Sequence, residues 1–375
     1  MKRKKVGLTF LSTYKEWAGG VIYILNIINA LQLVEDEKKP QLLIYYKEGA
    51  PIEDIATIGY PYIEYIEIEP GISKWKKWLN YGTLLFANKS LVTNTLPDVL
   101  YPDFRPMSFG RKPYHWIPDL QHYFLPHMSS AEEVISHKKY HESISKSNAV
   151  VVFSSKDAMN SFRKFYPDHV CELKLLRFAS IIPFDRNVDL VGLMARFDLK
   201  RPYFMAPNQF WKHKNHKVVL EAIKILRAEG LDFQVVFTGS QQDHRNKEYF
   251  GELKSFIEKE SLETHIRFLG FIDRKEQLKL MEESIALIQP SLFEGWSTVV
   301  EDAKAINKFI ILSSLPVHLE QISKNCEFFD PTRADELAVI MKSVLATPPS
   351  VVSGNYELNI KKFAEDFLKI FDEKK

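Results

Sequence analysis

The chain of 375 residues lacks several features that would place it in a specialised class of protein. It has only two cysteines, Cys171 and Cys326, which are far apart in the sequence and form no motif. We therefore expect no disulfide framework, and we expect the protein to be in a reducing compartment. No apolar run reaches the ~18 residues that a membrane span needs. The formal net charge of +2 is too balanced to favour nucleic acid as a partner.

Two motifs of cofactor and metal chemistry are also missing. No G-x-G-x-x-G fingerprint follows a strand, which argues against a nicotinamide-dependent dehydrogenase. No Asp-x-Asp pair of the metal-binding type occurs, so we expect neither a metal nor a cofactor. The basic N-terminus precedes a short apolar run without a small-residue cleavage site, which favours a first strand over a signal peptide.

The residues that are present indicate a globular α/β protein. Hydrophobic residues make up 45% of the chain and aromatic residues 13%, enough to bury sizeable cores. Short apolar runs alternate with amphipathic segments, a pattern typical of parallel sheets covered by helices. The predicted strands include residues 5–12, 41–47, 62–69, 97–103, 113–119, 149–155, 233–240, 266–272 and 326–331.

The most informative stretch covers residues 285–321, IALIQPSLFEGWSTVVEDAKAINKFIILSSLPVHLEQ. It predicts a buried strand, a turn-rich loop, a helix that ends near Asn307, and a second buried strand. Thr298 and Glu301 have the spacing of a capping box, which predicts that the helix begins there. The first turn of that helix has unpaired N–H groups and a positive dipole end, so it favours an anion such as phosphate.

This stretch resembles the donor-site signature of retaining glycosyltransferases of the GT-B fold, family 4. That signature is P-S-x-x-E-G-F-G, then a helix with a second acid, then G-K-P-V-I and a loop. The resemblance implies an α/β fold of two doubly wound, Rossmann-like domains that face each other across a cleft. Matching domains are residues 1–185 on the acceptor side and 186–353 on the donor side, with a helix over 354–375 that crosses back to the first domain.

In the second domain, the resemblance implies a binding site for a nucleotide-diphosphate sugar. Glu294 takes the position that contacts the transferred sugar, and Lys214 matches the family's diphosphate lysine. Gln209 occupies the place of an arginine, so one guanidinium is missing. Further implied donor contacts are the N–H groups of Ser297, Thr298 and Val299, the carboxylate of Asp302 for the ribose, and Phe271 and Ile272 beside the base.

Asp302 departs from the usual glutamate, so its carboxylate is one methylene shorter. We expect Asp302→Asn to impair donor binding while the melting temperature stays nearly constant, because Glu301 is the residue assigned to the cap.

In the first domain, two loops resemble those of the family that lie at the cleft. The pair Gly19 and Gly20 is predicted to follow a loop and precede a helix, which suits close approach of the backbone to the donor; a tight turn is the alternative. Asp119 and His122 follow a predicted strand where open α/β sheets bind ligands. The family often has a His-Asp pair here, but Pro118 precedes Asp119, so His122 is the substitute candidate for catalysis.

The segment Lys74–Tyr81 alternates lysines with Trp75, Trp78 and Tyr81. Such a segment can lie on an anionic membrane surface, or it can be a helix with buried tryptophans and a solvated lysine face. The expected location is therefore cytoplasmic, with peripheral contact at the inner face of the membrane as one alternative.

The implied activity is retaining transfer of a sugar to a hydroxyl of a glycan or lipid-linked acceptor, in bacterial surface polysaccharide synthesis. Two alternatives remain: a catalytically silent nucleotide-sugar-binding protein, and a sugar-nucleotide epimerase of the same fold.

Overall fold

The computed structural model describes residues 3–68, 96–104, 112–182, 188–243 and 245–372. The segment Lys74–Tyr81, for which a membrane contact was predicted, lies outside these ranges. The chain divides into two compact units. Unit 1 comprises residues 1–119, 135–181 and 357–375, and unit 2 comprises residues 120–134 and 182–356. The sequence-based boundaries had placed residues 120–134 in the first domain, whereas they group with unit 2.

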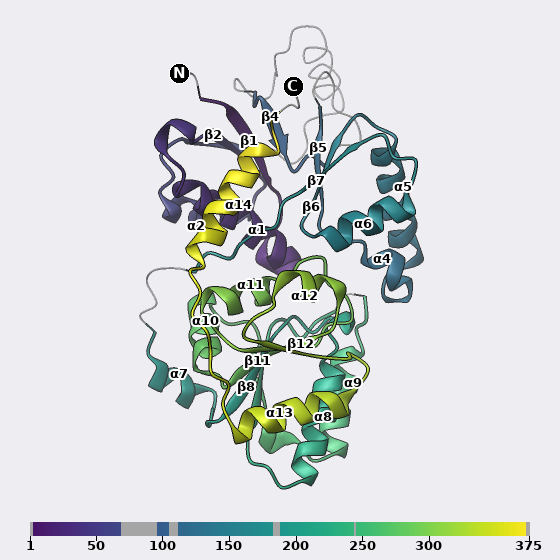
Figure 1. Cartoon of the computed structure of the whole chain (residues 1–375), viewed down its shortest axis with the longest axis vertical. Helices are drawn as coiled ribbons and strands as arrows, with labels where there is room; N and C mark the ends of the chain where they lie inside the picture. The colour runs from purple at the N-terminus through teal and green to yellow at the C-terminus, as the bar shows by residue number, and fades with distance from the viewer. Residues whose placement is uncertain (1–2, 69–95, 105–111, 183–187, 244, 373–375) are drawn as a thin grey trace. The chain divides into compact units, whose positions relative to one another are not determined.

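Unit 1 is built on parallel strands in two sheets (Figure 1). The first sheet has the order β3-β2-β1-β4, with β1 (Lys5–Phe10), β2 (Gln41–Tyr46), β3 (Ile63–Glu67) and β4 (Val99–Tyr101). The second has the order β5-β6-β7, with β5 (Tyr114–Ile117), β6 (Val150–Phe153) and β7 (Glu172–Leu175). The strand β3 lies at the end of this strand order, and its Ile residues alternate with Glu and Tyr, a pattern typical of a strand with one solvated face.

The helices of unit 1 connect these strands. They are α1 (Tyr14–Gln32), α2 (Ile52–Ile58), α5 (Ala131–Ser145), whose first turn groups with unit 2, α6 (Lys156–Phe165) and α14 (Glu357–Lys369), with a short 3₁₀ turn, η1 (Asp36–Lys38). The C-terminal helix α14 packs with α1, and Tyr101 contacts the rings of Phe367 and Phe371. The C-terminal segment therefore packs in the same core as helix α1 and strand β4.

Helix α1 begins earlier than the sequence analysis predicted. Thr13 and Glu16 form a capping box, so the helix starts at Tyr14 and the glycine pair lies inside it. Trp17 interrupts the helical geometry with φ −159° and ψ 80°. A Cβ at Gly20 would lie 2.3 Å from the Trp17 ring, so the missing side chain makes room for this indole. Gly20 therefore has a packing role in this helix, and its predicted contact with an anionic ligand stays a prediction.

Unit 2 contains one parallel sheet of six strands in the order β10-β9-β8-β11-β12-β13. The strands are β8 (Tyr203–Pro207), β9 (Gln234–Thr238), β10 (Ile266–Phe268), β11 (Ala286–Gln289), β12 (Ile310–Ser313) and β13 (Cys326–Phe329). Numbered within the unit, this is the order 3-2-1-4-5-6 of a dinucleotide-binding fold, and it reverses between β8 and β11. The prediction of an α/β fold with Rossmann-like domains is confirmed.

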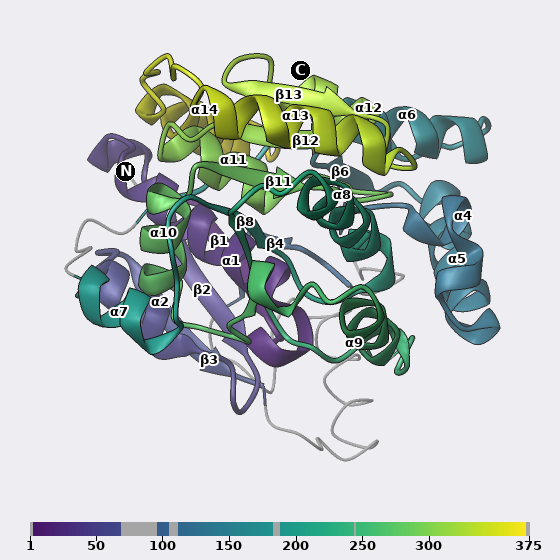
Figure 2. The ribbon, with the colours of Figure 1, turned by 90° about the horizontal axis from the view of Figure 1, so that it is seen from below.

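Unit 2 also contains helices and 3₁₀ turns, several of which are labelled in Figure 2. They are α4 (Gln121–Phe124), η2 (Pro126–Met128), α7 (Leu190–Arg196), η3 (Lys212–Lys214), α8 (His216–Ala228), α9 (Tyr249–Lys259), η4 (Glu263–His265), α10 (Arg274–Glu283), α11 (Thr298–Ala305), α12 (Pro316–Gln321) and α13 (Ala334–Ala346).

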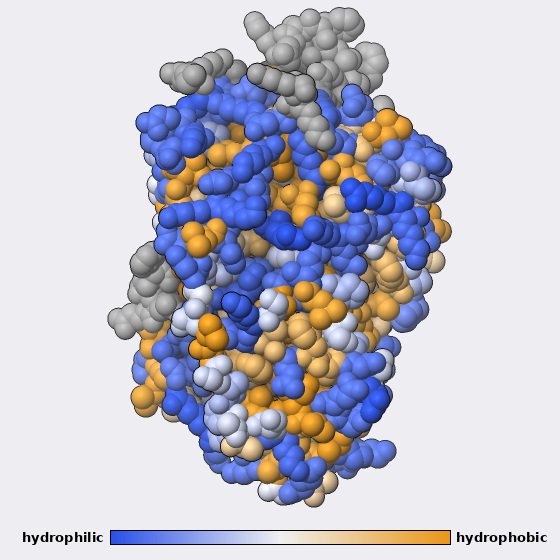
Figure 3. Space-filling view, viewed as in Figure 1, coloured by the Kyte–Doolittle hydropathy of each residue, from blue (hydrophilic) through white to orange (hydrophobic). Residues whose placement is uncertain are grey.

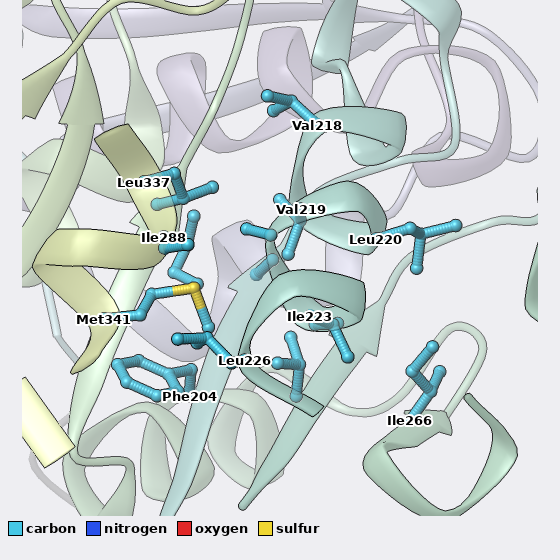
Figure 4. Packing of buried hydrophobic residues seen from close by; sticks show 14 of the residues in the cluster. Phe204, Val218, Val219, Leu220, Ile223, Leu226, Ile266, Ile288, Leu337 and Met341 are labelled. Carbon is cyan, nitrogen blue, oxygen red and sulfur yellow. The ribbon is translucent and has the colours of Figure 1, made fainter. Parts of the chain in front are cut away.

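The central strands β8, β9, β11 and β12 of unit 2 are mostly apolar because both faces of the sheet are buried there. Successive residues point to opposite faces, so Phe204 packs in one core and Met205 in the other. Figure 4 shows the first core, where Ile288 of β11 lies among side chains from α8 and α13, including Leu226 and Met341. This double burial holds the carboxyl ends of the strands in fixed positions.

The surface is mixed in character. Hydrophilic residues cover much of the face seen in Figure 3, with apolar residues scattered among them. The 50 basic and 48 acidic residues of the chain are consistent with such a surface.

The loop after β9 packs directly against the loop after the neighbouring strand β8. A Cβ at Gly239 would lie 2.5 Å from the carbonyl oxygen of Asn208, and the φ of Gly239 is +119°. We expect Gly239→Ala to cost more than ~2 kcal/mol of unfolding free energy, because a left-handed backbone and a steric clash combine. Gly230→Ala is the matched control, since Gly230 has φ +77° and an open environment. Equal melting temperatures of the two variants would contradict this packing.

Candidate functional site

A chain of polar side chains lies at the reversal point of the unit 2 sheet. Asn208 follows β8, and its Nδ2 donates to Gln289 Oε1 at the end of β11 (2.9 Å). Gln289 Nε2 in turn donates to Glu294 Oε1 (2.7 Å). Both amides are buried, with Gln289 fully inaccessible. Ligands of open α/β sheets bind outside the carboxyl ends of the strands, where the strand order reverses. These hydrogen-bonded side chains therefore lie where a ligand is expected to bind.

Glu294 is held through one of its two carboxylate oxygens. Lys214 Nζ (2.7 Å), Gln289 Nε2 (2.7 Å) and Ser291 Oγ (2.6 Å) all donate to Oε1. Within the part of the chain that the structure describes, no donor contacts Oε2. The side chain of Glu294 is 9% exposed and that of Lys214 is 15% exposed. The protein thus fixes the carboxylate and leaves one oxygen able to accept hydrogen bonds from a ligand.

Loop-to-loop contacts bring Lys214 and Glu294 together from segments 80 residues apart. The N–H of Leu292 donates to the His213 carbonyl (2.8 Å). Asn215, with a left-handed φ of 55°, donates from its Nδ2 to the Pro290 carbonyl (3.1 Å). These contacts join the loop after β8 to the loop after β11, so the ion pair is positioned by backbone as well as by charge.

Strand β12 supports the same loop from the other side. Ser313 Oγ donates to the Ser291 carbonyl (2.7 Å). His318 Nδ1 lies 2.8 Å from the Ser313 carbonyl, so this nitrogen carries the proton. Ser291 is therefore held in place while its hydroxyl reaches Glu294.

Charge within this cluster is balanced by Lys214. Burial, the largest single influence, would raise the pKa of Glu294, but the charge and hydrogen bond of Lys214 together with the neighbouring His318 and His213 lower this pKa to about 2. Burial lowers the pKa of His213 to about 3 and also lowers the pKa of His318, so both rings are neutral at pH 7. Lys214 is consequently the cation that neutralises Glu294 under neutral conditions.

His216 gives the cluster a measurable pH dependence. Its ring stacks on Phe210 at 4.2 Å, and burial lowers its pKa to about 3. In the unfolded chain the pKa returns to about 6.5, so between pH ~6.5 and ~3 the unfolded state binds more protons and stability falls as the pH is lowered. We expect His216→Phe to reduce this fall, measured by urea unfolding at pH 7 and pH 5. Exposed His127, replaced by Gln, is the control; an unchanged pH dependence in His216→Phe would contradict the assignment.

The N-terminus of α11 faces the same edge of the sheet, but its cap differs from the prediction. The N-cap is Ser297, whose Oγ accepts from the Val300 N–H (3.4 Å), so the predicted capping box of Thr298 and Glu301 is wrong. The Ser297 N–H donates to Gln321 Oε1 (3.1 Å) and is therefore occupied. In the described part of the chain, the N–H groups of Thr298 and Val299 contact no acceptor, which leaves two of the three predicted donors open.

The two neighbouring acids of α11 have different partners. Glu301 is 1% exposed and accepts from Lys304 Nζ (2.8 Å), Gln321 Nε2 (2.9 Å) and the hydroxyl of Tyr356. Asp302 is held by both terminal nitrogens of Arg274, with Nη1 at 2.7 Å from Oδ2. The side chain of Asp302 is 2% exposed and that of Arg274 is 28% exposed, so the guanidinium lies between this carboxylate and solvent.

The other predicted donor contacts lie near this edge of unit 2. Gln209 is partly buried, and its carbonyl accepts from the Trp211 N–H (2.7 Å). Phe271 is 63% exposed just after β10, whereas Ile272 is partly buried and packs on the second core. Phe271 is thus available to a planar ligand, and Ile272 has a structural contact already.

The two remaining candidates, Asp119 and His122, group with different units. Asp119 is partly buried at the end of its segment of unit 1. His122 lies in α4, which groups with unit 2, and is 6% exposed with its ring 4.4 Å from that of Tyr123. Their predicted catalytic roles stay predictions.

Sequence reasoning missed four residues that build this site, namely Asn208, Gln289, Gln321 and Arg274. Asn208 and Gln289 did carry a signal, because a polar residue that ends an apolar strand needs a partner when buried. Gln321 and Arg274 carried none, since their partners lie 24 and 28 residues away.

No group of three or more possible metal ligands occurs among the described residues. In the same ranges, no helix combines the length and apolar character required to span a bilayer.

Comparisons with known proteins agree with this geometry. Residues 195–365 match the profile of the family described as Glycosyl transferases group 1. The O-antigen chain mannosyltransferase RfbU of Salmonella typhimurium is 23% identical over 156 residues, which cover 42% of this chain and 42% of that protein. The sequence match thus spans less than half the length of this curated relative.

Solved structures extend the likeness to nearly the whole chain. Anabaena Alr3699/HepE, in complex with UDP and glucose, has a TM-score of 0.66 at 13% identity and covers 97% of this chain and 95% of its own. WaaG, a glycosyltransferase involved in lipopolysaccharide biosynthesis, has a TM-score of 0.62 at 12% identity, with 96% and 95% covered. The chain therefore has the GT-B fold, and its residues 195–365 are similar to the glycosyl transferases group 1 family.

Proposed function

We propose that this protein is a glycosyltransferase that moves a sugar from a nucleotide-diphosphate sugar to a hydroxyl, with retention of configuration. The observation that carries the proposal is the Glu294 carboxylate, which three donors fix through Oε1 while Oε2 stays open beside Lys214. A fixed carboxylate oxygen suits the hydroxyls of a sugar, and a cation next to it suits a phosphate.

The chemistry follows from where charge develops. The bond between the sugar C1 and the phosphate oxygen breaks, and its electron pair stays on the departing diphosphate. Lys214 and the N–H groups of Thr298 and Val299 stabilise that negative charge without reorganisation. The acceptor oxygen forms the new bond to C1, and its proton passes to the departing phosphate. This route needs neither a metal ion nor a protein base.

A turnover assay tests the proposal. The full chain is incubated with UDP-glucose and GDP-mannose in separate reactions, and release of the nucleoside diphosphate is followed with and without glycan acceptors. We expect release that depends on the acceptor, and an NMR spectrum that shows the same anomeric configuration in donor and product. An inverted product would overturn retention.

Two other outcomes would favour the alternatives. Binding of the nucleotide sugar without release of the nucleoside diphosphate would indicate a catalytically silent binding protein. Two observations favour this alternative: Gln209 replaces an arginine, and Asp302 is paired with Arg274. Conversion of the donor sugar without an acceptor would indicate an epimerase.

We further propose that the acceptor is a glycan or a lipid-linked glycan of a bacterial surface polysaccharide. The relatives RfbU and WaaG act in O-antigen chain and lipopolysaccharide synthesis according to their names, and the sequence Lys74–Tyr81 suits an anionic membrane. Each lysine near such a membrane contributes about 1 kcal/mol.

We therefore expect co-sedimentation with anionic liposomes at low salt and release as salt screens the charges. The triple replacement of Trp75, Lys76 and Trp78 by Ala should abolish sedimentation and leave donor turnover intact. Wild-type protein that ignores anionic liposomes at low salt would favour a soluble acceptor.

A further inference from the structure

The N-terminal end of α11 is held by a side chain from another helix, Gln321 of α12. The amide of Gln321 makes two hydrogen bonds with one residue: the Ser297 N–H donates to Oε1 (3.1 Å), and Nε2 donates to the Ser297 carbonyl (2.8 Å). Gln321 is 5% exposed and Ser297 is 2% exposed, so both are shielded from water. A single amide thus engages both backbone groups of the residue that caps α11.

A third hydrogen bond fixes the orientation of this amide. Gln321 Nε2 also donates to Glu301 Oε1 (2.9 Å), and Glu301 accepts in addition from Lys304 Nζ (2.8 Å) and from the hydroxyl of Tyr356. A flipped amide would place Oε1 against the Glu301 carboxylate and the Ser297 carbonyl, so only one orientation satisfies all of these groups. The amide is therefore not free to rotate.

The planarity of the peptide bond transmits this constraint to the next N–H group. The carbonyl of Ser297 and the N–H of Thr298 belong to one planar peptide group and point in opposite directions. The hydrogen bond from Gln321 Nε2 to this carbonyl therefore also sets the direction of the Thr298 N–H. That N–H is one of the two to which the proposed function assigns the diphosphate.

We infer that Gln321 is a positioning residue for the proposed sugar transfer: through the Ser297 carbonyl it directs the Thr298 N–H at the departing diphosphate. The inference rests on the proposed function, in which this N–H stabilises the developing negative charge. A donor of fixed direction needs no reorganisation when the charge appears, whereas a donor that must first reorient gives up part of its interaction. The role of Gln321 requires no contact with the substrate.

Gln321→Met tests the inference, because methionine has a similar length and makes neither hydrogen bond to Ser297. We expect kcat to be about 100-fold below that of the wild type, as for a reacting group displaced by about 1 Å, and KM to change much less. Gln234→Met is the matched control. Gln234 is 4% exposed at the start of β9, and it likewise accepts from a backbone N–H (Lys200, 2.6 Å) and donates to a carbonyl (Asp198, 3.3 Å). This control should also lose stability but keep the kcat of the wild type.

Phosphorus NMR of the bound nucleoside diphosphate gives a readout that does not depend on turnover. UDP and GDP are titrated into the wild type, Gln321→Met and Gln234→Met. We expect the β-phosphate signal of the bound nucleotide to be displaced in Gln321→Met and to coincide in the other two proteins. The same bound signal in all three would overturn the inference and leave the proposed function intact. Failure of the wild type to bind either nucleotide would instead contradict the proposed function, and the inference with it.

Tyr356→Phe keeps the test informative if Gln321→Met does not fold. It removes only the hydroxyl that donates to Glu301, so the carboxylate that orients the Gln321 amide loses one of its contacts. We expect a decrease of kcat of about three- to tenfold, the effect of one hydrogen bond, and a displaced β-phosphate signal. Tyr203→Phe is the control, because the Tyr203 hydroxyl donates to the Leu280 carbonyl (2.8 Å) at the start of β8. A kcat and a signal that stay unchanged in Tyr356→Phe would then overturn the inference.

Discussion

Lys214→Met is expected to lower both the stability of the protein and its affinity for a nucleoside diphosphate. The variant leaves the Glu294 carboxylate, 9% exposed, with two neutral donors and no counter-charge. Removal of one partner of a buried ion pair costs about 3–5 kcal/mol. Loss of a charge-assisted contact to phosphate adds a reduction in affinity of at least about tenfold. Urea unfolding and calorimetric titration with UDP measure the two effects.

The double variant Lys214→Met/Glu294→Gln separates charge from packing. It removes both charges, so we expect it to regain much of the stability that Lys214→Met loses, while UDP binding stays weak. Lys212→Met is the control for a lysine of the same loop, because Lys212 is exposed and should affect stability by less than ~0.5 kcal/mol. If the double variant were as unstable as Lys214→Met, the uncompensated carboxylate would not be the cause.

Asp302→Asn is the second substitution with a large expected effect. The prediction from the sequence was that this change leaves the melting temperature nearly constant, and the structure argues against it. Asp302 is 2% exposed and bound by both terminal nitrogens of Arg274. We expect a loss of about 2–3 kcal/mol, less than for a fully buried pair because Arg274 is 28% exposed and can still reach water.

Arg274→Met is expected to be more destabilising than Asp302→Asn, because it removes this counter-charge from the more deeply buried of the two groups. Thermal unfolding of both variants and of their combination measures the difference. If Asp302→Asn were less stable than Arg274→Met, the depth of burial of the remaining charge would not determine the loss of stability.

The same pair determines how the ribose is bound. If Asp302 binds the ribose hydroxyls, Arg274 must first release it, and UDP should bind at least about tenfold more tightly than 2′-deoxy-UDP or 3′-deoxy-UDP. Asp302→Asn should abolish that preference. Equal affinities in the wild type would show that the carboxylate stays with Arg274, and that the role implied by the resemblance does not apply to this chain.

The sequence alone determined the elements of unit 2 because their signals are local. Apolar runs of strand length predicted β11 and β12 around the site, and a helix was predicted to start where α11 does. Lys214 and Glu294 were identified from the resemblance, and the structure brings them to within 2.7 Å of each other. The sequence predicted the N-cap of α11 less accurately. Ser297, and not Thr298, accepts the hydrogen bond from a free N–H of the first turn.

Only the tertiary structure decided which polar groups meet. Asn208 and Gln289 are 81 residues apart and become neighbours because β8 and β11 are adjacent at the reversal of the sheet. The pairing of Asp302 with Arg274, and the indole of Trp17 over Gly20, depend in the same way on packing of separate segments and on one backbone break. Hydrophobic periodicity predicts the structure of one segment. The partner of a buried charge or ring depends on strand order and helix packing, and the periodicity of a single segment carries no information about either.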